Sequence, residues 1–148
     1  MLKIVAVSFL SIIIVFGAFS GGAASVTFEA ESGSLGSEFT NGMDGVVQFI
    51  SISTDTVNGG NPGNASRVAT YTVTFPTAGT YQLYARLRTG PDAFNDDSLF
   101  YGNGFGTQDP ANNAGWMLVN GLAGAGFSSA TDVVTGGGTL ASGMWKWI

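Results

Sequence analysis

The clearest alternation of apolar and polar residues lies between Arg67 and Tyr101. It has two arms, residues 69–75 and 81–88, in which the two kinds of residue change places at each position. A period of two puts one set on each face of a pleated strand, so both arms predict half-buried β-strands. Between them, Pro76-Thr77-Ala78-Gly79 predicts a tight turn, because proline presets φ and glycine accepts a positive φ. We therefore expect an antiparallel hairpin whose apolar face is covered by a second sheet.

Shorter alternating segments on both sides of this hairpin predict further strands, joined by long loops rich in Gly, Ser and Asn. In the segment 46–53, Ile50 and Ile52 should point inward, and Ser51 and Ser53 outward. The other predicted strands are residues 26–31, 98–101, 116–119, 132–134 and 144–148. Strands spaced in this way predict an all-β fold, a two-sheet antiparallel β-sandwich of jelly-roll type.

Composition agrees with many short strands. The 148-residue chain contains 23 glycines, is 12% aromatic and only 10% charged, and has no cysteine. This length suits one domain with a real core. Without disulfides, the stability of the domain must come from that core or from a bound metal ion.

The first 24 residues have a different character from the rest of the chain. Lys3 is followed by the apolar run 4–19 and then by the small residues 21–24. This order predicts a secretory signal peptide, residues 1–24, which we expect to be helical and to be removed. The alternative is a retained membrane anchor, but a run of roughly 16 apolar residues is short for a span of about 20. We expect the domain 25–148 to be secreted, to the extracellular space, the periplasm or the cell surface, and to leave the membrane after cleavage.

Loss of Lys3 makes the chain more acidic. Four basic residues then face ten acidic ones, a net charge of −6. An acidic surface without a basic run argues against nucleic acid as a partner and favours neutral ligands or cations.

Two groups of acidic residues could hold a cation. Glu29 and Glu31 are two apart in a predicted strand, so they share a face, and hard carboxylate oxygens suit Ca²⁺. The alternative is a solvated edge strand. The loop cluster Asp92, Asn95, Asp96 and Asp97 could bind a cation or sugar hydroxyls, or could simply form turns.

The three tryptophans carry large flat rings that could stack on sugars, although tryptophan in a strand is usually part of the core. We expect Trp147 in the core, and leave Trp145, at a loop-to-strand junction, open between the two roles. The chain has no His and no Cys, which removes the usual proton shuttles and thiol nucleophiles. No pair of carboxylates defines a cleft, so we do not expect an enzyme.

Four phrases of the sequence, in order, resemble family 6 and family 35 carbohydrate-binding modules. Phe28-Glu29-Ala30-Glu31 looks like their FEAE start, and residues 75–86 carry the phrase F-P-x-A-G-x-Y-x-L-Y-x-R. Residues 95–100 look like their N-D-S-F strand, and residues 143–147 are similar to their G-G-W-x-x-W region. The resemblance covers nearly all of residues 26–148.

The resemblance implies a calcium-containing jelly roll of galactose-binding-like topology, attached to a secreted polysaccharide-degrading enzyme. Glu29 and Glu31 would be structural calcium ligands, and Trp145 would be the tryptophan that stacks on the sugar. Phe49 and Trp116 are candidates for a ring facing Trp145. The side chains expected to bond sugar hydroxyls are Asn95 and Asp96.

The sequence departs from this family in two places. The tryptophans are spaced W-x-W here, and the final strands of the family have no counterpart, so we expect a module that is incomplete at its C-terminus. A downstream catalytic domain would then follow in the full-length protein. We expect a non-catalytic module that targets an enzyme or a cell surface to polysaccharide. The alternative is a structural or adhesive β-sandwich without a sugar site.

Overall fold

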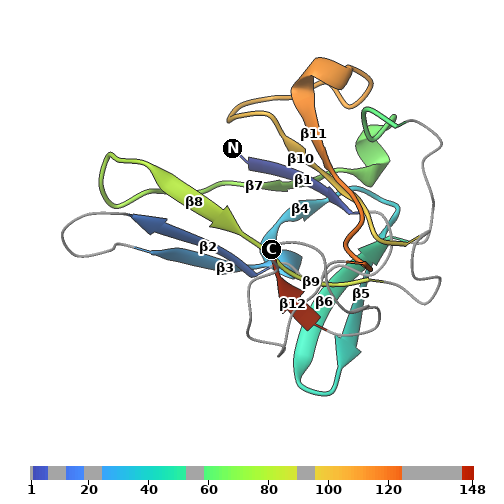
Figure 1. Ribbon diagram of the computed structural model, residues 1–148, viewed down its shortest axis with the longest axis horizontal. Coiled ribbons are helices and arrows are strands. Elements are labelled where there is room, and N and C mark those ends of the chain that lie inside the picture. Colours follow the sequence, from blue (N-terminus) through green and yellow to red (C-terminus); the bar gives the residue numbers. More distant parts are fainter. Residues whose placement is uncertain (1, 7–12, 19–24, 53–58, 90–95, 125–144) are drawn as a thin grey trace.

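The computed structural model describes residues 2–6, 13–18, 25–52, 59–89, 96–124 and 145–148 (Figure 1). These residues form twelve strands and three single-turn 3₁₀ helices, with no α-helix among them, which confirms the all-β class. The strands are β1 (Leu2–Ala6), β2 (Ile13–Ala18), β3 (Val26–Glu29), β4 (Ser34–Leu35), β5 (Phe39–Asp44), β6 (Val47–Ile52), β7 (Ala69–Tyr71), β8 (Tyr81–Tyr84), β9 (Arg86–Arg88), β10 (Leu99–Gly102), β11 (Trp116–Val119) and β12 (Trp145–Trp147). The 3₁₀ helices are η1 (Ala30–Ser32), η2 (Ala65–Arg67) and η3 (Asn113–Gly115).

The strands belong to four antiparallel sheets. The largest has the order β11-β10-β1-β7-β4, and a second has the order β3-β2-β8. The remaining two are the pairs β5–β6 and β9–β12. In Figure 1 the three-stranded sheet lies on one side of the molecule, and the β5–β6 hairpin extends from the opposite side.

The predicted hairpin is wrong in its pairing. Its first arm becomes β7, which pairs with β1 and β4. Its second arm divides into β8, which pairs with β2, and β9, which pairs with β12. Residues 72–80, between the two arms, form no strand. Alternation predicts that a segment is extended, but strand partners are decided by contacts between distant parts of the chain. The polypeptide here crosses from one sheet to another instead of folding back on itself.

The predicted signal-peptide helix is also wrong for the described residues. Residues 2–6 and 13–18 are the strands β1 and β2, both paired along two edges. These segments contain Ile4, Val5 and Val15, and β-branched residues favour strands over helices. Within the described part of the chain, no helix is long and apolar enough to cross a membrane. The predicted strand 132–134 lies outside the described residues.

The β5–β6 hairpin was predicted only in its second strand. Its register pairs Asp44 with Val47, which leaves Gly45 and Val46 as a two-residue turn. Gly45 has φ 61°, a value that glycine adopts without strain, as the short turns of antiparallel hairpins require. The Gly and Asn residues of β5 are typical of a loop, yet the strand pairs with β6 along its whole length.

The main core contains side chains from β5, β6, β7, β9 and β10 and from the segments beside them. Its buried residues are Ala30, Phe39, Ile50, Ile52, Ala69, Tyr71, Ala85, Leu87, Leu99 and Leu122. The inward placement of Ile50 and Ile52 is confirmed. The outward placement of Ser51 is wrong: its side chain is buried, and its hydroxyl shares a 3.0 Å hydrogen bond with that of Thr40. The neighbouring strand thus supplies the polar partner that burial demands.

Strand β12 pairs with β9 and buries a charged residue. Lys146 has no exposed surface, whereas Trp145 and Trp147, on the other face of the strand, are half-buried. Lys146 Nζ donates a hydrogen bond to the carbonyl of Leu122, and the backbone N–H of Leu122 donates to the carbonyl of Asp97 at 3.2 Å. Burial lowers the pKa of Lys146 from 10.5, and the charge of Asp97 opposes this. Trp147, expected in the core, is displaced from it by Lys146.

The buried lysine predicts a pH-dependent stability. Below 10.5 and above its lowered pKa, Lys146 binds fewer protons in the folded chain than in the unfolded chain. The free energy of unfolding therefore rises with pH in this window, by at most about 1.4 kcal/mol per pH unit for one proton. Lys146→Met should remove this rise, which urea unfolding at successive pH values up to about 10 would measure. Identical slopes in the two proteins would contradict this account of Lys146.

Candidate functional site

Trp145 is held by a carboxylate that also pairs with an arginine. Asp44, at the end of β5, accepts a 2.8 Å hydrogen bond from Trp145 Nε1 and a 2.5 Å bond from Arg88 Nη1 on β9. The side chains of Arg88 and Asp44 keep 26% and 43% of their surface exposed, so water screens this ion pair. The three residues join β5, β9 and β12 at one point on the surface.

The Trp145 ring also has aromatic and cationic neighbours. The Phe49 ring centroid lies 5.9 Å away, with an angle of 56° between the ring planes. The guanidinium carbons of Arg88 and Arg86 lie 5.3 and 5.7 Å from the Trp145 ring centroid, within the range of cation–π attraction. The ring is thus oriented by packing as well as by its hydrogen bond.

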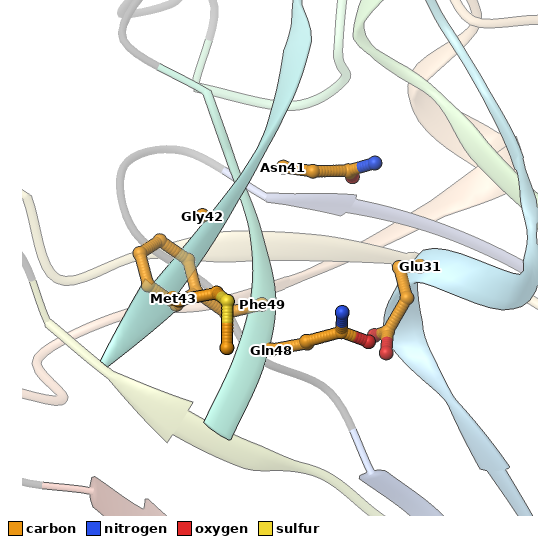
Figure 2. Close-up of a pocket in the computed structure, with 6 residues that line it drawn as sticks. All are labelled: Glu31, Asn41, Gly42, Met43, Gln48 and Phe49. Atoms are coloured by element: carbon orange, nitrogen blue, oxygen red, sulfur yellow. The ribbon is translucent and has the colours of Figure 1, made fainter. Parts of the chain in front are cut away.

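A surface pocket of about 320 Å³ lies on the β5–β6 hairpin, and one wall of it is the Phe49 side chain. The residues that line it are Glu31, Asn41, Gly42, Met43, Gln48 and Phe49 (Figure 2). In Figure 2 the side chains of Gln48 and Glu31 point toward one another, with Met43 beside Gln48, while the Phe49 ring points to the other side of β6, over Gly42. The pocket therefore combines two amides and a carboxylate with an apolar wall, a composition suited to a ligand rich in hydroxyl groups.

The wall formed by Phe49 depends on a glycine. The hairpin register places Gly42 directly opposite Phe49. A Cβ atom at Gly42 would collide with the Phe49 ring, so the ring occupies the space that any other residue would fill. Packing of an aromatic ring over a cross-strand glycine is a known way to stabilise a glycine in a sheet.

A second pocket, of about 470 Å³, contains the two predicted calcium ligands. It is lined by Glu29, Glu31, Met43, Val46, Val47, Gln48 and Arg86. The strand predicted to run through Glu31 ends at Glu29, and Glu31 lies in η1, but both carboxylates still line one pocket. Because Glu31, Met43 and Gln48 also line the first pocket, the two pockets are neighbours.

The calcium prediction agrees with one feature of this pocket. Glu31 Oε2 is buried and has no hydrogen-bond partner among the described residues, which is costly unless a cation or another donor meets it. No group of three or more acidic side chains lies together in the described ranges. Glu29 and Glu31 can therefore supply two to four oxygen ligands, fewer than the six to eight that Ca²⁺ takes in proteins.

The structure brings together only part of the predicted sugar site. Phe49, 8% exposed, contacts Trp145. Trp116 instead belongs to a separate buried cluster with Val68 and Phe100, and its Nε1 donates to the carbonyl of Asp109 at 2.9 Å. Its side chain is 6% exposed and packs in that cluster, so the ring that faces Trp145 in this structure is Phe49 and not Trp116.

The loop cluster is only partly described. Asn95 and Asp92 lie outside the described residues. Asp96 is half-buried, and Asp97 is buried, with its carboxylate accepting a 3.1 Å hydrogen bond from the N–H of Ala123. Asp97 is thus bonded to the backbone of a segment 26 positions further along the chain, and not to its own loop as a turn-forming side chain would be.

Several residues of the site were not predicted, among them Asn41, Asp44, Gln48 and Arg88. The hydrogen bond between Asp44 and Trp145 joins residues 101 positions apart, and no local sequence pattern predicts such a contact. The only signal for Asn41 and Gln48 is their position on the strands that flank the Gly45 turn.

Comparisons with protein-family models, with curated proteins and with solved structures gave no match to this chain.

Substitution of the cross-strand glycine tests how the pocket wall is built. Gly42→Ala should push the Phe49 ring away, with a loss of about 1–3 kcal/mol in the free energy of unfolding and a change in the near-UV circular dichroism of Trp145. Gly79→Ala is the matched control, because its Cβ would meet only a Tyr81 ring atom at 4.0 Å. Equal stability of the two variants would show that Phe49 does not pack on Gly42.

Proposed function

We propose that this chain is a secreted, non-catalytic carbohydrate-binding module that holds an attached enzyme or a cell surface against polysaccharide. The observation that carries the proposal is the pocket on the β5–β6 hairpin, which is lined by the amides of Asn41 and Gln48 and by the Phe49 side chain. The half-buried ring of Trp145 contacts Phe49 from the adjoining sheet. Hydrogen-bonding groups next to aromatic surface are what a pyranose requires.

In the proposed mechanism, the apolar C–H face of a sugar ring packs on the exposed part of the aromatic pair Phe49–Trp145. The hydroxyl groups at the edge of the ring bond to the side-chain amides of Asn41 and Gln48. Carboxylates and amides bind hydroxyls without any proton transfer, so binding needs no catalytic group. The affinity of one such site would be modest, and several sites on one polysaccharide would add avidity.

The proposal extends to the overall arrangement of the sheets. We infer a galactose-binding-like jelly roll, on the strength of the resemblance of residues 26–148 to family 6 and family 35 modules. The N-terminal apolar segment would direct export. An excess of acidic residues over basic ones favours polysaccharide over nucleic acid as the partner. A catalytic domain downstream in a longer protein would be the enzyme that the module targets.

One observation supports the second candidate, a structural or adhesive protein. Strand β11 pairs only with β10 among the described strands, and its residues Met117 and Leu118 are each 45% exposed. An apolar edge strand can add a strand from another chain. Fibres or oligomers that form with rising concentration, without glycan binding, would favour this candidate.

Glycan-array binding and affinity electrophoresis in polysaccharide gels test the sugar site. Trp145→Ala and Gln48→Ala should each weaken binding at least about tenfold, or 1.4 kcal/mol, while the melting temperature shows that the domain still folds. Phe105→Ala is the matched control, since Phe105 is 59% exposed and contacts Phe75, away from the pocket residues. Wild-type protein that binds no glycan, or variants that all bind equally, would contradict the proposal.

We also propose that Ca²⁺ binds at Glu29 and Glu31. A bound calcium ion would supply a hard positive charge to the buried Glu31 oxygen and tie η1 to the neighbouring hairpin. The ion would stabilise the fold and would make no contact with the sugar. Arg86, which lines the same pocket, contributes a positive charge that weakens cation binding.

Calcium titration tests this proposal separately. Calcium at a hundred times its Kd should stabilise the domain by about 2.7 kcal/mol, seen as a higher melting temperature that a chelator reverses. Glu31→Gln should abolish the shift, whereas Asp109→Asn, which removes an equal charge from a distant loop, should retain it. A shift that persists in Glu31→Gln would place calcium elsewhere.

A further inference from the structure

The N-terminal strands occupy the middle of two sheets. In the five-stranded sheet, β1 pairs with β10 on one edge and with β7 on the other, so that Ile4 lies opposite both Tyr101 and Ala69. In the three-stranded sheet, β2 pairs with β3 and β8, so that Val15 lies opposite both Thr27 and Tyr84. All four pairings are antiparallel.

These two strands connect parts of the fold that have no other described strand pairing between them. Without β1, the five-stranded sheet would separate into the pairs β11–β10 and β7–β4. Without β2, neither β3 nor β8 would have a partner strand among those described. Four strand edges would then present backbone N–H and C=O groups that need new partners.

The strands on either side carry side chains of the core. Ala69 and Tyr71 on β7, and Leu99 on β10, are buried members of the main core. Phe28 on β3 and Leu83 on β8 are partly buried and pack against the same core. The two positions between these strands are therefore suited to extended apolar segments, and the sequences of residues 2–6 and 13–18 are almost wholly apolar.

We propose that the facing edges of β10 and β7, and of β3 and β8, form strand-acceptor sites whose occupant is the N-terminal segment of this same chain. The segment that looks like an export signal would then have a second role, as the donor of two strands that complete the folded domain. This goes beyond the proposed sugar binding and does not depend on it. Either proposal can fail while the other holds.

The donor strand β2 is connected to the proposed sugar site through β8, β9 and β12. Strand β8, which pairs with β2, is followed after Ala85 by β9, and β9 pairs with β12, which carries Trp145. Loss of β2 would therefore free one end of the segment that supports Trp145. The folded domain that presents the site would include residues 2–6 and 13–18 as well as those after residue 24.

Proline substitution in the full chain tests the strand pairings. A proline in a middle strand removes a ladder hydrogen bond that a neighbouring strand needs. Ile4→Pro and Val15→Pro should each lower the melting temperature by roughly 5–10 °C, or prevent folding. The matched controls Ile4→Val and Val15→Ile keep the backbone N–H and should melt within about 2 °C of wild type. Proline variants that melt with their controls would overturn the proposal.

The fate of the segment on export gives an independent readout. Intact mass and N-terminal sequencing of the full chain, expressed with its own N-terminus and recovered after export, should show residues 2–18 retained or held as a co-purifying fragment. The proposal is overturned by a folded product that begins near Ser25, carries no such fragment and melts as high as the full chain. Failure of the shortened product to fold, with folding restored by a peptide of residues 1–24, would support it.

Discussion

The β6 strand is buried along most of its length, and the candidate site depends on this constraint. Residues Phe49, Ile50, Ser51 and Ile52 are all buried. Ile50 and Ile52 belong to the main core, while Phe49 lies over Gly42 and contacts Trp145. A slip of one residue in the β5–β6 register would move the isoleucines out of the core and replace Phe49 at the pocket wall. The burial that fixes the register therefore also fixes the pocket.

Packing positions Trp145 more strongly than the charge pair beside it. The Asp44–Arg88 pair is partly exposed, and pairs of this kind contribute at most about 1 kcal/mol. The Phe49 contact and the indole hydrogen bond to Asp44 define the ring's place in the described structure. On the opposite face of β12, Lys146 is buried and bonded to the Leu122 carbonyl, which fixes which face of the strand the tryptophans occupy.

Local patterns in the sequence predicted strands better than they predicted partners. The extended segments at residues 47–52, 99–102, 116–119 and 145–147 follow from period-two alternation and β-branched or aromatic content. The pairing of β7 with β1 and β4 could not be predicted in this way, because it is chosen among distant strands. Lys146 is buried in place of the expected Trp147, because a lysine can lie in a core when its ammonium group donates to an acceptor.

The residues of the candidate site were also predicted only in part, because local patterns do not determine contacts between distant segments. Trp145 and Phe49 were named, and they do lie in contact, but Trp116 has equal aromatic character and is enclosed in another cluster. Composition cannot distinguish an open ring from a buried one. The identity of Asp44 as the acceptor for Trp145 depends on a contact between residues 101 positions apart, which only the folded structure supplies.

The most direct measurement of the central claim is a nuclear magnetic resonance titration of the three tryptophan indole N–H groups with a soluble oligosaccharide that the domain retains. Trp145 lies at the proposed sugar site, whereas Trp116 is buried and bonded to the Asp109 carbonyl. The account predicts a saturable shift of the Trp145 indole signal, with the Trp116 signal unchanged. An oligosaccharide that binds without shifting the Trp145 signal, or that shifts Trp116 instead, would contradict it.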